Sequence, residues 1–538
     1  MSAEKKERRK TGMSDAGDFI RQFRKVKEIP PLKYRQFRNV SESETKRKRK
    51  KFREWTIMKT VRYRDTNAVS QKYQRRGNNC MRIEHDSIGN VSLPDNVYYG
   101  VQSERARENF PITGQSMNPY MIESLTVIKK AAAIANQKAG DLEPEIASAI
   151  IRACDEILSG KLRDQFIVDP IQGGAGTSAN MNANEVIANR ACEILGGTKG
   201  DGRVHPNDHV NMAQSTNDVF PTAGKLTALK MIDNLMAALE GLIRAFEKKG
   251  KEYESVLKLG RTQLQDAVPM YVGQEFKAHA NALRRCQNRI LRSRNELFDL
   301  NLGATAIGTS INASEGYLNC VVEILADLIG QPVKMADNLI DATQNADSFA
   351  AVSSAIKNCA LVMSKIANDM RLLSSGPCGG IEELQLPARQ PGSSIMPGKI
   401  NPVIPEVVTQ AAFLVAGNDV TISMAVEAGQ LELNAFEPVI FFCLFQSLGV
   451  LTHAADTFRQ RCVEGIFVDV DHCRELLMKS TVIATALCPD FGYEKATDIV
   501  KIAQKEHKTV LEVAEKELNI PREQLEEIVS GCLKKKED

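Results

Sequence analysis

A regular apolar stripe through residues 225–246 is the feature that most limits how this chain can fold. Apolar side chains recur there every three or four positions, which is the spacing of one face of a long α-helix with a coiled-coil-like seam. The stripe consists of Leu226, Leu229, Ile232, Leu235, Leu239, Leu242 and Phe246. The same pattern occurs at 120–138, 180–196, 270–300, 346–374 and 405–425. Alternating strand patterns are scarce, so the sequence predicts a mainly α bundle of helices about 25 residues long, joined by glycine-rich loops.

A chain of 538 residues exceeds what one hydrophobic core usually supports, so a compact monomer would divide into two to four domains. A long multi-helix architecture is the other way to use such length. Long helices also expose more apolar edge than one bundle buries, and association of several chains would cover the excess. From about residue 470 onward the expected elements are shorter, with a turn near CPDFGYEK and a final helix from Pro521 to Lys536. We expect this segment to form a small separate cap.

No membrane span is expected, although residues 436–451 are strongly apolar. Glu437, Pro438 and Gln446 interrupt this run, and a span needs about 18 uninterrupted apolar residues. The run therefore predicts a buried core helix.

The first 80 residues differ sharply in charge from the rest of the chain. They contain 25 Lys and Arg against 9 Asp and Glu, a balance of +16, so the remainder carries −13 of the total of +3. These residues show little apolar periodicity, which predicts a largely disordered extension. They also contain no apolar core of a secretory signal. The basic run from Lys46 to Lys51 is of a kind that can bind nucleic acid or an acidic surface. A solvated tail, or an upstream extension before a functional start at Met81, is the favoured interpretation.

The twelve cysteines are dispersed and form no C-x-x-C pair. This spacing argues against a zinc site and against a secreted disulfide framework, and it favours the reducing cytosol as the location of the protein. His205 and His209 are assigned a structural role, and no carboxylate cluster identifies a divalent-ion site. The sequence therefore predicts no metal site.

Three polar loops each precede an expected helix. They contain GGAGTSAN at 173–180, STND at 215–218 and GSSIMPGKINP at 392–402. Helix starts leave backbone N–H groups unpaired and bind anions readily, although the same Ser, Thr, Asn and Asp residues also serve as helix caps. The third loop is not a phosphate loop, because five residues separate its glycines and Ile400 follows the lysine. Together the three loops favour a small ligand with several negative charges.

A fourth polar segment, KLGRTQLQDAVPM at 258–270, lies between two expected helices. With these four segments in this order, residues 81–530 resemble the aspartase/fumarase superfamily of homotetrameric lyases. The resemblance implies a three-domain fold whose long central helices form a twenty-helix bundle in the tetramer. Beyond the extension at 1–80, it implies an amino-terminal lyase domain at 81–218, a central helical bundle domain with the signature loop at 219–470 and a small carboxy-terminal helical domain at 471–538.

Within the superfamily the chain is similar to aspartases more than to class II fumarases. Gln263 stands where fumarases typically have histidine, and NLGATAIGT, PVIPEVV and AEAGQLELN are aspartase-like variants. The resemblance implies reversible elimination of ammonia from L-aspartate to give fumarate. Class II fumarate hydratase, or a lyase for a related aspartate derivative, is the alternative. An inactive family member that serves as a structural or basic-tail binding protein is a further one.

The resemblance also implies roles for nine residues. Ser393, in the signature loop 392–402, matches the general base that would remove the Cβ proton and leave an enediolate-like aci-carboxylate intermediate. The substrate-binding set is Thr177, Ser215, Thr216, Asn217, Thr262, Gln263, Lys399 and Asn401. In this family each site is assembled from three subunits. Glu406 matches the glutamate that partners the fumarase histidine; because Gln263 replaces that histidine here, the role of Glu406 stays open. The resemblance implies no required cofactor, with stimulation by Mg²⁺ as in some aspartases.

Overall fold

The computed structural model of the chain describes residues 81–531. The basic extension at 1–80 and the last residues of the predicted final helix lie outside the described residues. The described part is mainly helical, as the sequence predicts. Its strands are two to seven residues long and pair as two-stranded sheets.

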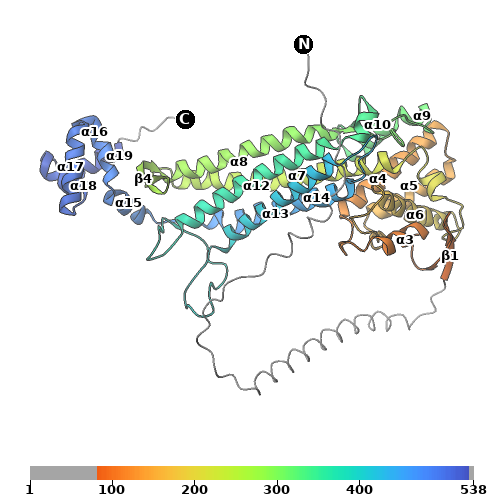
Figure 1. Cartoon of the computed structure of the whole chain (residues 1–538), viewed down its shortest axis with the longest axis horizontal. Coiled ribbons are helices and arrows are strands. Elements are labelled where there is room, and N and C mark those ends of the chain that lie inside the picture. Colours follow the sequence, from red (N-terminus) through yellow and green to blue (C-terminus); the bar gives the residue numbers. More distant parts are fainter. Residues whose placement is uncertain (1–80, 532–538) are drawn as a thin grey trace, which may run out of the picture. The chain divides into compact units, whose positions relative to one another are not determined.

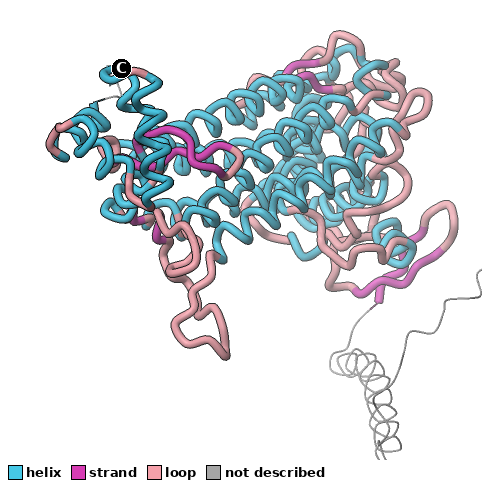
Figure 2. Tube along the Cα trace, turned by 60° about the vertical axis from the view of Figure 1, so that its left-hand side comes forward, coloured by secondary structure: helices cyan, strands magenta, loops and turns pink. Residues whose placement is uncertain are grey.

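Five long helices form the centre of the fold (Figures 1 and 2). They are α7 (Thr216–Glu252), α8 (Val272–Arg294), α12 (Asp347–Leu373), α13 (Val403–Glu427) and α14 (Glu437–Arg461). Helix α7 packs on α8 and α14, α8 on α12, α12 on α13, and α13 on α14, so the five helices close into a ring. The helices predicted at 225–246, 270–300, 346–374 and 405–425 are confirmed as members of this bundle.

Helix α7 forms where the apolar stripe predicts it, but it starts earlier and ends later. Its first turn is fixed by a capping box, in which Ser215 and Asp218 bond each other's backbone N–H groups. The stripe faces inward along its whole length, and aromatic contacts close both ends of the helix. Phe220 lies 5.2 Å from Phe441 between ring centres near the start, and Phe246 lies 6.0 Å from Phe458 near the end.

The elements that precede α7 pack against one another and against that helix. They are β1 (Met81–His85), β2 (Asn90–Pro94), α3 (Val101–Asn109), α4 (Pro119–Ala139), α5 (Pro144–Leu158) and α6 (Thr177–Ile194). Helix α4 contacts α5 and α7, and α6 contacts α5 and α3. The helices predicted at 120–138 and 180–196 are therefore confirmed as α4 and α6.

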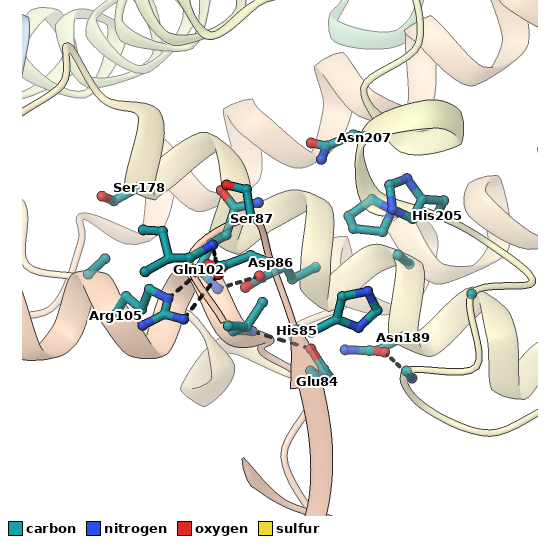
Figure 3. A pocket seen from close by; sticks show the side chains of 18 of the residues that line it. Glu84, His85, Asp86, Ser87, Gln102, Arg105, Ser178, Asn189, His205 and Asn207 are labelled. Atoms are coloured by element: carbon teal, nitrogen blue, oxygen red, sulfur yellow. Dashed lines mark hydrogen bonds and ion pairs between the residues drawn. The ribbon is translucent and has the colours of Figure 1, made fainter. Parts of the chain in front are cut away.

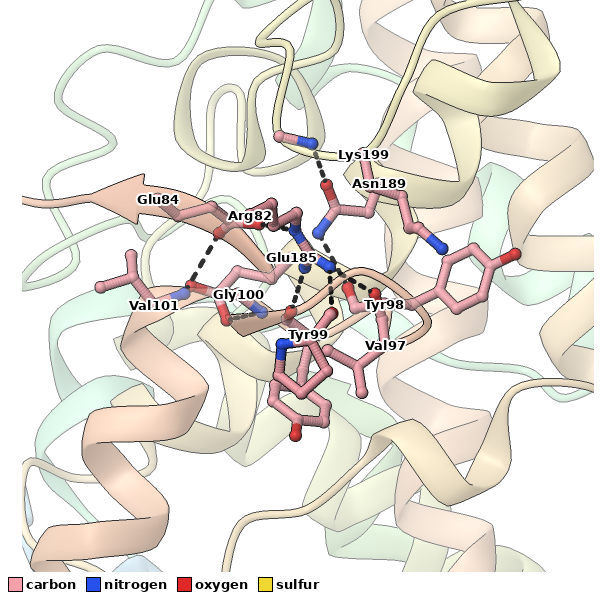
Figure 4. Close-up of polar contacts among 12 residues, drawn as sticks. Arg82, Glu84, Val97, Tyr98, Tyr99, Gly100, Val101, Glu185, Asn189 and Lys199 are labelled. Atoms are coloured by element: carbon pink, nitrogen blue, oxygen red, sulfur yellow. Dashed lines mark hydrogen bonds and ion pairs between the residues drawn. The ribbon is translucent and has the colours of Figure 1, made fainter. Parts of the chain in front are cut away.

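A buried carboxylate holds the start of α3 against α6 (Figure 4). Glu185 accepts hydrogen bonds from the backbone N–H groups of Gly100 at 2.9 Å, Gln102 at 2.8 Å and Ser103 at 3.1 Å. These N–H groups at a helix start have no partner within their own helix. A side chain of α6 therefore supplies the cap that the sequence around α3 lacks.

Smaller elements connect these layers. Strands β3 (Leu257–Thr262) and β4 (Gln265–Tyr271) form an antiparallel hairpin, β5 (Asp299–Leu300) pairs in parallel with β6 (Lys334–Met335), and β7 (Leu384–Gln385) pairs with β8 (Phe467–Val468). The short helices are α9 (Glu315–Leu318), α10 (Val321–Ile329), α11 (Leu339–Gln344), the π-helix η3 (Pro206–Val210) and the 3₁₀ turns η2 (Arg163–Gln165), η4 (Asn295–Phe298), η5 (Val463–Gly465) and η6 (Thr481–Ile483).

The last described helices have an apolar core of their own, which includes Leu487, Ile499, Leu511 and Leu525. They are α15 (Val470–Lys479), α16 (Ala484–Phe491), α17 (Tyr493–Glu506), α18 (Val510–Leu518) and α19 (Arg522–Gly531). The turn predicted across CPDFGYEK is narrower than expected. Only Gly492 breaks the helix, at φ 81°, because the preceding residues continue α16 and the following ones begin α17.

Three of the described helices are long and apolar enough to cross a membrane by length and composition, namely α12, α13 and Glu437–Gly465. All three belong to the central bundle, where they pack against one another. The apolar character of α14 follows from its burial, because its Phe441, Leu444 and Leu448 belong to the core. Helix α13 differs, since Phe413 is 66% exposed and Met424 68% exposed.

Candidate active site

The signature loop connects α12 to α13 and is closed by its own hydrogen bonds. The backbone N–H of Gly392 donates to the carbonyl of Lys399 at 2.8 Å, and Asn401 Nδ2 donates to the carbonyl of Gly392 at 3.0 Å. A Cβ atom on Gly392 would lie 2.4 Å from that carbonyl oxygen of Lys399, so the close approach requires glycine. The loop therefore brings Ser393, Lys399 and Asn401 together within one short segment.

The hydroxyl of Ser393 sits against the backbone of this loop. Its Oγ accepts hydrogen bonds from the N–H groups of Ile395 at 3.2 Å and Met396 at 3.1 Å. Two N–H dipoles aimed at one oxygen stabilise negative charge on it. The side chain is half-buried, and Lys399, further along the same loop, is exposed. This arrangement suits an oxygen that must carry a proton in one state and a charge in the other.

The first predicted loop turns sharply before α6. Gly174 and Gly176 have φ values of 84° and 88°, and Thr177, the first residue of α6, bonds the carbonyl of Gly174 at 2.7 Å. A Cβ atom on Gly176 would lie 2.3 Å from the ring of Phe220 on α7. The glycines therefore allow the start of α6 to lie close to the start of α7, and Thr177 is exposed there.

The second predicted loop caps α7 and also contacts α6. Ser215 and Thr216 stand at the helix start, where Thr216 Oγ1 accepts a hydrogen bond from Asn180 Nδ2 at 3.2 Å. Asn217 Nδ2 donates to the carbonyl of Ala306 at 2.7 Å. Ser215 therefore does act as a helix cap, which was the simpler interpretation of these residue types. The contact with Asn180 places Thr177 and Thr216 at neighbouring helix starts.

Two buried ionisable groups lie in or next to this loop, and the sequence reasoning gave neither of them a role. Lys129 donates to Asn211 at 2.8 Å and to Gln214 at 2.9 Å, and burial lowers its pKa to about 7. Burial raises the pKa of Asp218 to about 6, although the N–H groups of Ser215, Gly303 and Thr305 bond its carboxylate. A lysine inside the apolar face of 120–138 was the available signal for the first group.

Thr262 and Gln263 lie at the tip of the β3–β4 hairpin and are exposed. The tip is a two-residue turn, with Gln263 at φ 54° and Leu264 at φ 62°. Both values lie in the left-handed region that residues with side chains adopt at a cost. The polar turn predicted at this place is confirmed, and its strained form could not be read from the sequence.

Within one chain, these segments form two groups rather than one site. Thr177 and Ser215–Asn217 lie at the start of α6 and α7, whereas the hairpin follows the end of α7. The signature loop belongs to the hairpin group, because the segment that leads into it, at Glu383, pairs with Arg261 of β3 at 2.8 Å. Glu406, at the start of α13, lies 3.8 Å from Arg371 and has no closer ionic partner among the described residues.

A cavity of about 760 Å³ lies between β1, α3 and α6 (Figure 3). Arg105 and Asp86 pair at 2.8 Å on its wall, and the hydrogen bond from Arg105 holds the pKa of Asp86 at about 2. Within residues 81–531, none of the nine predicted site residues lines this cavity, although Ser178 and His205 do. No group of three or more His, Cys, Asp and Glu side chains in the described part is arranged to hold a metal ion.

The structure is thus that of a mainly α protein in which a polar loop, closed by its own hydrogen bonds, connects two helices of the bundle. A family model described as lyase matches residues 89–417, and a second, described as fumarase C C-terminus, matches residues 483–531. The chain belongs to this lyase family.

Among curated proteins, the chain is similar to an aspartate ammonia-lyase of Bacillus sp., with 50% identity over 454 residues, 84% of this chain and 97% of the relative. An aspartate ammonia-lyase of Bacillus subtilis is 52% identical over 423 residues, 78% of this chain and 89% of the relative.

Two solved structures share the fold. One, described as fumarate lyase:delta crystallin from Brucella melitensis bound to cobalt, has a TM-score of 0.82 and 47% identity, covering 84% of this chain and 99% of its own. The other, a class II fumarase from Schistosoma mansoni, has a TM-score of 0.79 and 35% identity, covering 84% of this chain and 98% of its own.

Proposed function

We propose that this lyase catalyses the reversible elimination of ammonia from L-aspartate to give fumarate. One observation carries the proposal: the signature loop is intact and folds its serine oxygen onto two N–H groups, in a chain half identical to aspartate ammonia-lyases over most of its length. The class II fumarase is less similar, at 35% identity.

The difficult step is removal of a proton from Cβ of the substrate, next to a carboxylate whose charge opposes a carbanion. That carboxylate takes up the charge as an enediolate-like aci form if positioned donors stabilise it. Ser393, as its alkoxide, accepts the proton. The Cα–N bond then breaks, its electron pair stays with nitrogen, and the carbanion pair forms the double bond of fumarate.

The surroundings of Ser393 support this role. A serine hydroxyl is a weak acid, so the alkoxide needs stabilisation from its environment. The N–H groups of Ile395 and Met396 already donate to Oγ, and the Lys399 cation lies in the same closed loop. Lys399 and Asn401 then bind the substrate, together with Thr177, Ser215, Thr216, Asn217, Thr262 and Gln263.

Gln263 favours elimination of an amine over hydration. A glutamine amide binds a carboxylate oxygen but does not relay a proton near neutral pH. Addition of water to fumarate requires an activated water, whereas the substrate ammonium group leaves as ammonia without one. The reaction as written requires no cofactor, and any effect of Mg²⁺ would add to the basal turnover. We place the enzyme in the cytoplasm.

The active form is proposed to be a homotetramer whose sites are shared between subunits. The two groups of candidate residues lie apart within one chain, so neither group alone surrounds a substrate. Helix α13 exposes a row of large apolar side chains, which a second copy of the chain would bury. These are Val407, Phe413, Leu414, Val420 and Met424.

The proposal is tested by following fumarate absorbance after addition of L-aspartate or L-malate to the purified chain. Fumarate from aspartate is expected. Fumarate from malate but none from aspartate would assign fumarate hydratase activity instead. Ser393→Ala should abolish turnover with an unchanged sedimentation profile, and retained activity would remove the base assignment.

A further inference from the structure

Four charged side chains form a cluster at the base of the β3–β4 hairpin, and two of them belong to β3 itself. Glu383 accepts a hydrogen bond from Arg261 Nη1 at 2.8 Å through one carboxylate oxygen and pairs with Lys258 Nζ at 3.0 Å through the other. Lys258 also pairs with Glu275, at the start of α8, at 2.7 Å. The cluster has two positive and two negative groups, so its net charge is zero.

The cluster is well shielded from water. The side chains of Glu383 and Lys258 are 1% and 4% exposed, and that of Arg261 is 16% exposed. Burial alone would lower the pKa of Lys258, but the carboxylates of Glu275 and Glu383 hold it above its usual value. Buried ions keep their charges only when partners of opposite sign are held close. Each member of the cluster therefore fixes the place of its neighbour.

The β3–β4 hairpin, which carries Lys258 and Arg261, is irregular and strained. Its ladder shifts register between Leu259 and Arg261, and a Cβ atom on Gly260 would lie 2.6 Å from the carbonyl of Val268. Two-residue turns with positive φ favour Asn-Gly, yet here the residues are Gln263 and Leu264. Backbone of this kind persists only where the surrounding structure determines it.

Glu383 is placed to supply that constraint. It lies on the segment that enters β7, and its backbone carbonyl accepts the N–H of Asp469 at 3.1 Å, which ties the segment to the chain beyond β8. Its carboxylate reaches Arg261, one residue before Thr262 and two before Gln263. On the opposite strand, Asp266 accepts a hydrogen bond from Ser480 at 2.5 Å. Both strands are thus held from outside the hairpin.

We propose that Glu383 is a positioning residue, which holds the Thr262–Gln263 turn in the conformation that binds substrate. The inference rests on the proposed function, in which this turn contacts the substrate. Glu383 itself touches no substrate. It acts through Arg261, while Lys258 fixes the second oxygen of its carboxylate.

A neutral replacement at this position would disturb the turn in a defined way. Glutamine offers one oxygen where the two cations require two, and its amide N–H groups would face either Arg261 or Lys258. The displaced cation would move the base of the hairpin, and shifts of about 1 Å in a binding group can change turnover parameters up to about a hundredfold. Because the turn binds substrate and carries no base, the effect should fall on KM more than on kcat.

The test compares Glu383→Gln with Asp419→Asn in the full-length tetramer. Asp419 is also a buried carboxylate with a hydroxyl and a lysine partner, Ser353 at 2.8 Å and Lys357 at 2.5 Å, but both partners lie on α12. We expect KM for L-aspartate to rise about tenfold or more in Glu383→Gln, with a smaller change in kcat. Asp419→Asn should lower the melting temperature without that rise in KM.

Rescue separates positioning from folding. Adding Lys258→Met to Glu383→Gln removes the cation that faces the amide and leaves the amide oxygen for Arg261, so KM should return toward the wild-type value. An unchanged KM in Glu383→Gln, or a rise of equal size in Asp419→Asn, would overturn the inference. If Glu383→Gln does not assemble, Glu383→Asp, which keeps the charge but shortens the reach, must show the rise in KM for the inference to stand. Wild-type protein inactive with aspartate would instead defeat the proposed function.

Discussion

The length of α7 leads to a test of how the active site is built. The helix has 37 residues and therefore extends about 55 Å, with Ser215 at its start and the β3–β4 hairpin beginning five residues after its end. The signature loop lies in the hairpin group, through the contact between Glu383 and Arg261. A four-carbon dicarboxylate spans a few ångströms, so it cannot contact Asn217 and Ser393 of the same chain. If both residues contact the substrate, as proposed, each site takes them from different chains.

This arrangement predicts that two inactive chains restore activity when they are combined. One chain carries Asn217→Ala and the other Ser393→Ala, and each alone forms inactive tetramers. In a mixed tetramer, a site is intact only if its residue 217 comes from the Ser393→Ala chain and its residue 393 comes from the Asn217→Ala chain. With equal amounts and random assembly, each condition holds for half of the sites, so activity should reach about a quarter of the wild-type value.

The assay uses two co-expressed chains with different affinity tags, captured in sequence so that only mixed tetramers remain. Fumarate formation from L-aspartate is then measured per tetramer. The matched control combines Ser393→Ala with Asn401→Ala. Both changes lie in the signature loop, so every site receives a damaged loop and no activity should return. Absence of recovery in verified mixed tetramers, or equal recovery in the control, would refute the shared site.

Four further predictions follow from individual groups. Burial raises the pKa of Asp218 from 3.8 to about 6. The contribution of this group to the free energy of unfolding should therefore fall by up to about 3 kcal/mol as pH rises from 4 to 6, and stay level above pH 6. Asp218→Asn should remove this part of the pH dependence of the melting temperature. Glu185→Gln turns one acceptor of the α3 cap into a donor and should cost roughly 2–4 kcal/mol, seen as a lower melting temperature, whereas an unchanged value would show that the cap is dispensable. Deleting residues 1–80 should leave kcat and KM unchanged, and a large loss would give the extension a role in turnover. Chelation with EDTA should leave basal turnover intact, and its abolition would reveal a required metal ion.

The long helices could be predicted from the sequence because burial on one face repeats at every turn. The stripe of Leu226 to Phe246 lies inside α7, and the other predicted ranges agree with α4, α6, α8, α12 and α13 to within a few residues, except at the end of α8. There the chain leaves the helix at Asn295 for a 3₁₀ turn and then β5. The apolar pattern continues through that change, because the residues after the helix are buried as well, and so the pattern gives no signal of the helix end.

The candidate site residues were located through motif resemblance, and their roles remain predictions. The structure adds their surroundings, which local patterns do not contain. Glu383 contacts residues more than 120 positions away in the chain, and Lys129 contacts residues more than 80 positions away. Neither has a neighbour in the sequence that reveals its partner. A buried charge inside an apolar segment is a visible signal, but the group that neutralises it is visible only in the fold.

Helix α6 shows why the loops of this protein depend on distant side chains. Many of its polar side chains are buried, and several bond the backbone of other segments, because a buried backbone group without a partner is costly. Asn182 accepts the N–H of Ile167 and donates to the carbonyl of Gln165, and Asn189 donates to the carbonyl of Tyr98. Asn180 donates a hydrogen bond to the side-chain hydroxyl of Thr216 in the second loop, while the first loop ends at the start of α6 itself. One helix therefore contributes to the geometry of two predicted substrate-binding loops, and a change in its polar face should disturb both together.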